Sequence, residues 1–292
     1  MQYWKILRIL TTDACNYKCV YCHNEGQEKI KTFNNLLFDD FLALMQGTKD
    51  SGIEEVRFSG GEPLMNKETL KMIEWVDKNT DYEVGLATNA SLITEEIAQR
   101  LSKTRVMITI HFPGATKDTY KKITANEYDR FRKNLLLLDK YRVDYSFNFV
   151  LHSSTDGHLD DVLEYAISNK KRVKILPFID KDSDTFLLKN VEKINERLSD
   201  CDCEKVYDDE KGFYIWTFKN GGQIKILNSP CLRKDIRNCK EYGELRVLPG
   251  LRFKKCIFGE EIPVVSKDLG EMREQIDNLW NGFCSCERGK TL

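Results

Sequence analysis

The sequence predicts an α/β fold: a partial (β/α)6 barrel of the TIM-like type, followed by a smaller second domain. Segments with strand and helix character alternate six times within residues 1–184, and such alternation favours a parallel sheet with right-handed crossovers. Six units in about 180 residues suit a partial barrel better than a complete eight-stranded one. The alternation ends after about residue 185.

The elements of the first part follow from the spacing of apolar residues. Strands are predicted at 5–11, 53–59, 82–88, 105–111, 144–151 and 172–178. Helices are predicted at 36–48, 67–78, 94–102, 116–141 with a break near Asn126, and 158–169. Folds of this kind carry their sites at the carboxyl ends of the strands, so the functional residues are expected there.

The second part begins after a polar linker, "DKDSDTF". Residues 186–199 are predicted to form one helix, and residues 213–227 a hairpin around Asn-Gly-Gly. The remainder is expected to be irregular and rich in basic residues. The predicted domains are therefore 1–184, the barrel, and 185–292, a small cysteine-bearing domain.

Composition excludes several classes of protein. The 292 residues include 45 basic and 46 acidic side chains, which leaves a net charge of −1. That balance argues against non-specific binding to nucleic acid or to a membrane surface. No apolar run approaches the roughly 20 residues of a membrane span, and no signal peptide is visible, so a cytoplasmic location is expected.

The ten cysteines are clustered rather than scattered. The groups are Cys15, Cys19 and Cys22; Cys201 and Cys203; Cys231, Cys239 and Cys256; and Cys284 and Cys286. In a reducing compartment, clustered cysteines indicate metal ligands before disulfides. Three thiolates do not complete a structural zinc site, and His23 is awkwardly placed as a fourth ligand. On a cubane iron–sulfur cluster, three cysteines leave one iron open.

The spacing Cys-x3-Cys-x2-Cys, directly after the first predicted strand, resembles the radical S-adenosylmethionine (SAM) superfamily. Tyr21 precedes the third cysteine, as is usual in that family. The second strand runs into Gly60-Gly61-Glu62-Pro63, which is similar to the family's SAM-binding turn, and the third ends in "ATNAS". These features occur in the expected order on the expected elements.

The resemblance implies the cofactors and the reaction. Cys15, Cys19 and Cys22 would hold a [4Fe-4S] cluster whose open iron binds SAM, while Gly60 to Pro63 hold the methionine amino group. One electron from a flavodoxin- or ferredoxin-type donor would cleave SAM, and the resulting 5′-deoxyadenosyl radical would abstract hydrogen from a substrate.

The resemblance also assigns residues outside the two motifs. It implies that Asn89 lies near the SAM ribose and Asn148 near SAM or substrate. His111 ends the fourth strand, so it would hydrogen-bond either substrate or SAM. A purely structural histidine is the alternative.

Longer stretches resemble the GTP 3′,8-cyclase (MoaA-like) branch, notably "LRILTTDACNYKCVYC" and "VRFSGGEPLM". Cys231, Cys239 and Cys256 are similar in order to the ligands of that branch's second cluster. Arg8, Arg57 and Arg246 match positions of its basic triphosphate pocket. Glu55, Ser146 and Glu244 stand where the branch has lysine or arginine, so GTP is not the expected substrate.

The segment "DNLWNGFCSC" resembles the twitch and SPASM extensions of other radical SAM enzymes. On that interpretation Cys284 or Cys286 completes an auxiliary [4Fe-4S] cluster, and the role of Cys201 and Cys203 stays open. Three hypotheses follow: a cyclase-like enzyme acting on a small nucleotide-like or acidic molecule, a maturase that modifies a ribosomal peptide, and a non-enzymatic metal-binding module.

Overall fold

The computed structural model describes residues 5–22, 33–178, 184–199, 201–208, 212–227, 244–255, 257 and 259–282. Six residues singled out in the sequence lie outside these ranges: His23, Cys231, Cys239, Cys256, Cys284 and Cys286.

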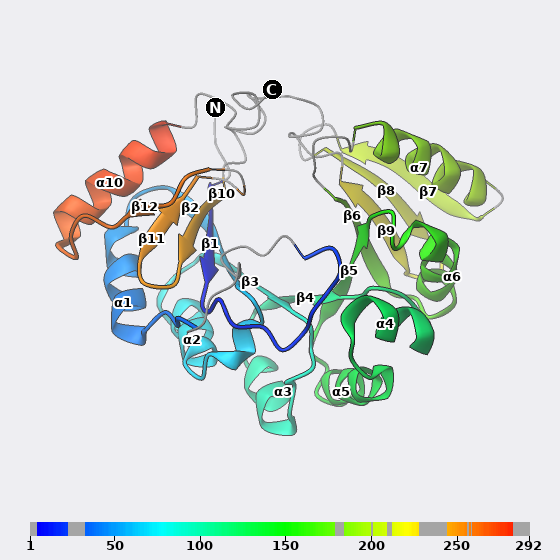
Figure 1. The fold of residues 1–292 in the computed structure, drawn as a ribbon, viewed down its shortest axis with the longest axis horizontal. Coiled ribbons are helices and arrows are strands. Elements are labelled where there is room, and N and C mark those ends of the chain that lie inside the picture. Colours follow the sequence, from blue (N-terminus) through cyan, green and yellow to red (C-terminus); the bar gives the residue numbers. More distant parts are fainter. Residues whose placement is uncertain are drawn as a thin grey trace.

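The described strands form a single twelve-stranded sheet that is bent into an open arch (Figure 1). Its order is β12-β11-β10-β1-β2-β3-β4-β5-β6-β9-β8-β7. The six central strands are β1 (Lys5–Leu10), β2 (Ile53–Ser59), β3 (Glu83–Thr88), β4 (Met107–His111), β5 (Tyr145–Leu151) and β6 (Arg172–Pro177). They are parallel and follow one another in sequence order, which confirms the predicted α/β partial barrel.

Six α-helices connect these strands and cover the convex side of the arch (Figure 1). They are α1 (Phe38–Gly47), α2 (Thr69–Asn79), α3 (Glu95–Leu101), α4 (Lys117–Thr124), α5 (Tyr128–Lys140) and α6 (Leu159–Ser168), with short 3₁₀ turns η1 (Pro63–Met65) and η2 (Asp156–His158). The break predicted near Asn126 is confirmed. Ala125 ends α4 in the left-handed region at φ 58°, which directs the chain out of the helix.

The chain beyond residue 184 extends the same sheet at both edges. After α7 (Asp184–Arg197), strands β7 (Cys203–Asp208), β8 (Phe213–Phe218) and β9 (Gln223–Leu227) run antiparallel, and β9 pairs in parallel with β6. The β8–β9 pair confirms the predicted hairpin. The sheet is thus continuous across residue 184, where the sequence predicted a domain boundary.

The other edge was expected to be irregular, and this expectation is wrong for the described part. Strands β10 (Glu244–Leu248), β11 (Arg252–Lys254) and β12 (Ile262–Pro263) add to it, and helix α10 (Leu269–Asn281) packs on α1. β10 is parallel to β1, with Leu245 opposite Leu7. Its strand conformation comes from this long-range pairing, which a local pattern does not reveal.

Buried apolar and half-buried polar side chains alternate along the strands, and this alternation separates the hydrophobic core from the site. On β1, Leu7 and Ile9 are fully buried, while Arg8 between them is half-buried. On β2, Val56 and Phe58 flank Arg57 in the same way. Successive side chains of a strand point to opposite faces. The apolar set therefore packs under the helices, and the polar set faces the concave side of the arch.

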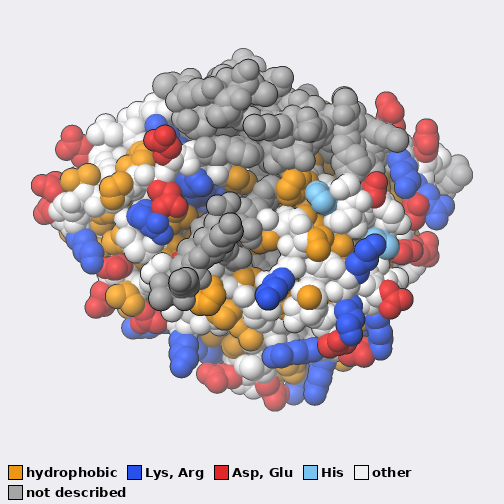
Figure 2. All heavy atoms as spheres, in the orientation of Figure 1, with side chains coloured by type: hydrophobic (Ala, Val, Ile, Leu, Met, Phe, Trp, Pro, Cys, Tyr) orange, Lys and Arg blue, Asp and Glu red, His pale blue; other side chains and the backbone are white. Residues whose placement is uncertain are grey.

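The outer surface carries charges of both signs. Figure 2 shows basic and acidic side chains interspersed over the face in view, in keeping with the net charge of −1. Among the described helices, none has the length and apolar character that crossing a bilayer requires.

Candidate active site

The segment that carries the first three cysteines follows β1 and crosses the arch toward β5 (Figure 1). We call residues 11–22 the cysteine loop. Its far end is tied to the end of α4, where the amide of Lys18 donates to the carbonyl of Thr124 at 3.4 Å and that of Val20 to Ile123 at 3.2 Å. Cys15 and Cys19 of this loop are half-buried and Cys22 is exposed.

The three thiols influence one another electrostatically. Burial raises the pKa of the Cys19 thiol to about 12, and the charges of Cys22 and Cys15 act in the same direction. Such a group ionises readily only beside positive charge, which bound iron supplies. The donor set, three thiols on one loop, fits a cluster that is held by cysteine thiolates.

The geometry does not favour a single-ion site. In the described part of the chain, no three histidine, cysteine or acidic side chains are grouped so that they could hold one metal ion. Three thiolates that bind separate irons of one cubane do not have to meet at a point.

The Gly-Gly-Glu-Pro turn after β2 is hydrogen-bonded to the cysteine loop. The amide of Gly61 donates to the carbonyl of Thr12 at 2.9 Å, and that of Glu62 to Ala14 at 2.8 Å. Gly60 has φ 143°, and a Cβ there would lie 2.4 Å from the carbonyl oxygen of Thr12. Glycine is required at this position because any side chain would separate the turn from the loop.

The carboxylate of Glu62 is buried at the centre of this contact. It accepts hydrogen bonds from Thr88 Oγ1 at 2.7 Å, from the amide of Asn89 at 2.7 Å and from the amide of Leu64 at 3.2 Å. Burial raises its pKa to about 7, although these bonds oppose the shift. An ionised carboxylate offers about four acceptor positions, so Oε2 retains room for one further donor, such as an ammonium.

Asn89 links the end of β3 to the cysteine loop. Its Nδ2 donates to Asn16 Oδ1 at 2.9 Å, and its Oδ1 accepts from the amide of Ser91 at 2.9 Å. Asn16 in turn donates to Ser91 Oγ at 2.7 Å. The side chain thus has a positioning role in the protein itself, while its expected contact with ribose stays a prediction.

His111 contacts the cysteine loop at two side chains. Its Nε2 is 3.5 Å from Cys19 Sγ and 3.2 Å from Tyr21 Oη. Burial lowers the pKa of its imidazole to about 4, so the ring is neutral at pH 7. A neutral imidazole carries one N–H donor, which can be directed at the sulfur.

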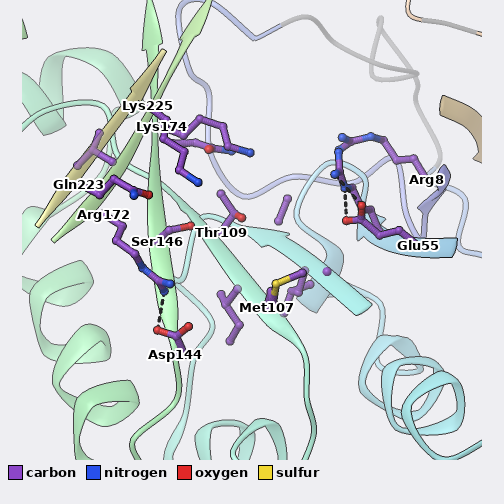
Figure 3. Close-up of a pocket in the computed structure, with 17 residues that line it drawn as sticks. Arg8, Glu55, Met107, Thr109, Asp144, Ser146, Arg172, Lys174, Gln223 and Lys225 are labelled. Atoms are coloured by element: carbon purple, nitrogen blue, oxygen red, sulfur yellow. Dashed lines mark hydrogen bonds and ion pairs between the residues drawn. The ribbon is translucent and has the colours of Figure 1, made fainter. Parts of the chain in front are cut away.

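Below the cysteine loop, the concave face encloses a cavity of about 300 Å³ (Figure 3). Its lining includes Arg8, Arg57, Ser146, Asn148, Lys174 and Lys225. Arg246 is buried beside Arg8, its register partner on the neighbouring strand. Arg8 and Arg57, two of the expected substrate residues, therefore face one space with Asn148, which was expected near SAM or substrate.

The three arginines on β10, β1 and β2 are paired with carboxylates of the chain. We call Arg246, Arg8, Arg57, Glu244 and Glu55 the arginine wall. Glu244 is bonded to Arg8 at 2.6 and 2.7 Å and to Arg246 at 2.6 Å, with Arg57 3.7 Å away. Glu55 takes both Nε and Nη2 of Arg57, the latter at 2.8 Å.

The charge of Glu244 depends on these neighbours. Burial by itself would raise its pKa, but Arg8, Arg246 and Arg57 hold the carboxyl well below its usual range. The carboxylate is therefore ionised at every physiological pH, and it neutralises guanidinium charge that would otherwise face the cavity.

Sequence analysis missed Lys174 and Lys225. They come from β6 and β9, which are register partners although a helix and two strands separate them in sequence. The available signal was the polar position inside each apolar strand, "RVKILP" and "QIKIL".

Cys201 and Cys203 lie apart from the site. They are half-buried at the start of β7, the edge strand at the opposite end of the arch from β1 (Figure 1). Both positions pack at the margin of the hydrophobic core.

Comparison with known proteins agrees with this geometry. Residues 9–166 match the family model of the radical SAM superfamily, which covers more than half of the chain. The chain belongs to the radical SAM superfamily and is an enzyme.

Individual relatives and solved structures are similar to this chain in sequence or in fold. The probable GTP 3′,8-cyclase of Methanothermobacter thermautotrophicus is 24% identical over 294 residues, 92% of this chain and 91% of that protein. The probable GTP 3′,8-cyclase of Thermococcus kodakarensis is 26% identical over 268 residues, covering 86% and 84%. SuiB of Streptococcus suis, solved with its precursor peptide SuiA, superposes with a TM-score of 0.73 at 14% identity, over 98% of this chain and 68% of SuiB.

Proposed function

We propose that this enzyme cleaves SAM and abstracts hydrogen from a small nucleotide-like or acidic substrate other than GTP. The observation that carries the proposal is the arginine wall. Its guanidinium groups, expected for a triphosphate, are already bonded to Glu55 and Glu244.

In this proposal the chain's residues divide the work. Cys15, Cys19 and Cys22 hold a [4Fe-4S] cluster, and the turn from Gly60 to Pro63 presents its main chain and the open position of Glu62 to the SAM amino group. SAM bound there supplies the 5′-deoxyadenosyl radical when an electron arrives from a flavodoxin- or ferredoxin-type donor. The cavity below orients the substrate and keeps water away from the radical.

A triphosphate fits this cavity poorly. Like charges 4 Å apart repel by about 1 kcal/mol in water and by about 4 kcal/mol near a protein surface. Glu55 and Glu244 would each impose such a cost. Separating them from their arginines would leave buried charges unpaired, which costs more.

An auxiliary [4Fe-4S] cluster is part of the proposal, with Cys231, Cys239, Cys256 and either Cys284 or Cys286 as ligands in a twitch/SPASM-like domain of residues 185–292. One contact between described residues supports it. Lys255 Nζ donates to the carbonyl of Gly282 at 3.2 Å. The segments just before Cys256 and Cys284 therefore meet.

A peptide maturase is the second candidate. The likeness in fold to SuiB, which was solved with a precursor peptide, favours it. The small cavity favours the first candidate, because its 300 Å³ suits a small molecule better than a peptide. The non-enzymatic module no longer applies, since the chain belongs to an enzyme superfamily.

The test is anaerobic reconstitution followed by product analysis. About eight irons per chain are expected for two cubanes, together with 5′-deoxyadenosine when SAM and a reductant are added. With GTP present, no cyclised nucleotide is expected. Abundant cyclised product would overturn the exclusion of GTP, and absence of 5′-deoxyadenosine would overturn the proposed function.

A further inference from the structure

One row of side chains leads from the cysteine loop into the cavity. In register across four parallel strands lie His111 on β4, Asn148 on β5, Lys174 on β6 and Lys225 on β9. The row begins at Cys19, whose Sγ is 3.5 Å from His111 Nε2. Its last three members line the cavity.

Lys174 differs from the arginines opposite, which are paired with carboxylates. Figure 3 shows Lys174 and Lys225 extending from their strands into the cavity that Arg8 and Glu55 border from the other side. Within the described residues, the Lys174 ammonium has no carboxylate partner. Its Nζ lies 5.5 Å from the centroid of the Phe213 ring, in a cation–π contact.

The electrostatic surroundings of Lys174 leave room for an anion. Burial lowers the pKa of its ammonium to about 8, and the positive charges of Arg57, Lys225 and Arg8 act in the same direction while Glu55 opposes them. A group in this state is stabilised when a negative ligand binds beside it. Nearby Arg172 is not available in this way, because it is paired with Asp144 at 2.5 Å.

Asn148 supplies a second, independent feature. Its Oδ1 is buried and has no hydrogen-bond partner in the described structure. A buried polar atom without a partner is destabilising, and a hydrogen bond from a ligand in the cavity would remove that cost. Asn148 is the register partner of both His111 and Lys174, so it stands between the thiols and the ammonium.

We infer that the substrate carries a carboxylate or phosphate group that binds Lys174 and Lys225, while its reacting carbon lies toward His111 and Asn148 hydrogen-bonds the part between them. This inference rests on the proposed function. On this inference the anion binds at the opposite wall, formed by β5, β6 and β9, and not at the arginine wall.

The row also limits the size of the substrate. Neighbouring strands are about 4.8 Å apart, so two strand spacings place Lys174 about 10 Å from His111. A small metabolite with one acidic end spans that distance. Because the arginine wall is internally paired, a second acidic end would find no equivalent site.

Pyridoxal 5′-phosphate is a suitable probe, since it joins a phosphate to an amine-reactive aldehyde. The full-length reconstituted chain is incubated with it near pH 7.5, the imines are reduced with borohydride, and the labelled peptides are identified by mass spectrometry. Lys103, an exposed lysine that follows α3, is the internal reference. Pyridoxal without the phosphate and protection by inorganic phosphate are the two controls.

We expect Lys174 or Lys225 to be labelled about tenfold more than Lys103, because a charge-assisted phosphate contact would hold the probe beside these lysines. Inorganic phosphate should remove this preference, and pyridoxal should not show it. Equal labelling of Lys103, no protection by phosphate, or equal labelling by pyridoxal would each overturn the inference.

Two variants strengthen the test. Lys225→Met should reduce labelling of Lys174 about tenfold, whereas Lys225→Arg, which keeps the charge, should preserve it. Loss in both, or in neither, contradicts a shared anion site. Labelling does not require SAM cleavage, so failure here is distinguishable from failure of the proposed function, which 5′-deoxyadenosine formation reports.

Discussion

Different interactions hold two regions of this enzyme, one at the carboxyl ends of its strands and one deeper in the arch, toward their amino ends. The first comprises the cysteine loop, the Gly60–Pro63 turn and Asn89, which are joined by hydrogen bonds of main-chain and side-chain groups, among them the buried Glu62 carboxyl. The second is the cavity, whose arginine wall is joined by ion pairs between strands that are distant in sequence. The first region follows a family pattern, whereas the second carries what is particular to this chain.

The comparison separates cofactor from substrate. On the proposed function the first region needs a fixed backbone, because its main-chain groups and three thiolates would hold the cofactor. The second can change with single substitutions. Two glutamates placed two residues before arginines, Glu244 before Arg246 and Glu55 before Arg57, share their face of the strand and neutralise them. On the proposed function, the same scaffold would then bind a ligand other than GTP.

The largest expected effect lies in the first region. Cys19→Ala removes a proposed cluster ligand, so formation of 5′-deoxyadenosine should fall to the uncatalysed level. Cys203→Ala is the matched control, because it removes a half-buried thiol on the edge strand β7. Full activity of the first variant, or equal loss in both, would contradict a special role for the cysteine loop.

The next effect tests the second region. Glu244→Gln leaves Arg8, Arg246 and Arg57 without their shared carboxylate, so unfolding in urea should become easier by about 3–5 kcal/mol. Binding of inorganic pyrophosphate should tighten in the same variant. Glu261→Gln, which breaks the exposed pair with Arg252, should cost at most about 1 kcal/mol. Similar losses would show that the arginine wall is no stronger than a surface ion pair.

The ionisation of Glu62 makes the free energy of unfolding depend on pH. Its folded pKa of about 7 exceeds the ordinary value of 4.5, so burying the ionised carboxylate opposes folding. The Glu62 contribution to the stability of the cluster-free chain should fall by about 3 kcal/mol in total as the pH rises from about 4.5 to 7, whereas His111, whose pKa is lowered from 6.5 to about 4, contributes in the opposite direction below about pH 6.5. Urea titrations between pH 5 and pH 8 measure this loss.

Wild type should therefore lose stability relative to Glu62→Gln over that range, because a neutral amide does not titrate and the His111 contribution is common to both chains. Glu244 has a depressed pKa, so its own contribution is present above pH 4.5 and is lost only on further acidification. A difference in stability between wild type and Glu62→Gln that does not change between pH 5 and pH 7 would contradict the ionisation assigned to Glu62.

The smallest expected effect compares two glycines with positive φ. Gly60→Ala places a Cβ against the carbonyl of Thr12, whereas Gly221→Ala, at φ 95°, meets nothing within 4 Å. Both variants carry backbone strain of about 1–3 kcal/mol, but only the first should also weaken SAM binding, measured by equilibrium dialysis. Equal SAM affinity in both would show that the turn tolerates separation from the cysteine loop.

The sequence by itself determined the barrel and the cysteine loop. The alternation of apolar runs gave the central strands to within a few residues, because each βα unit is a local pattern. Cys15, Cys19 and Cys22, with Gly60 and Glu62, were recognisable because their spacing along the chain is itself the chemical requirement.

Only the tertiary structure determined the ion pairs of the arginine wall and the position of Lys174 and Lys225 on the opposite wall. Glu244 lies 236 residues from Arg8, and Lys225 joins Lys174 because β9 returns to pair with β6. No periodicity within a short window encodes these contacts, since strand pairing chooses partners by burial across the whole sheet. Residue types showed that charges were present, and the fold determined which of them neutralise each other.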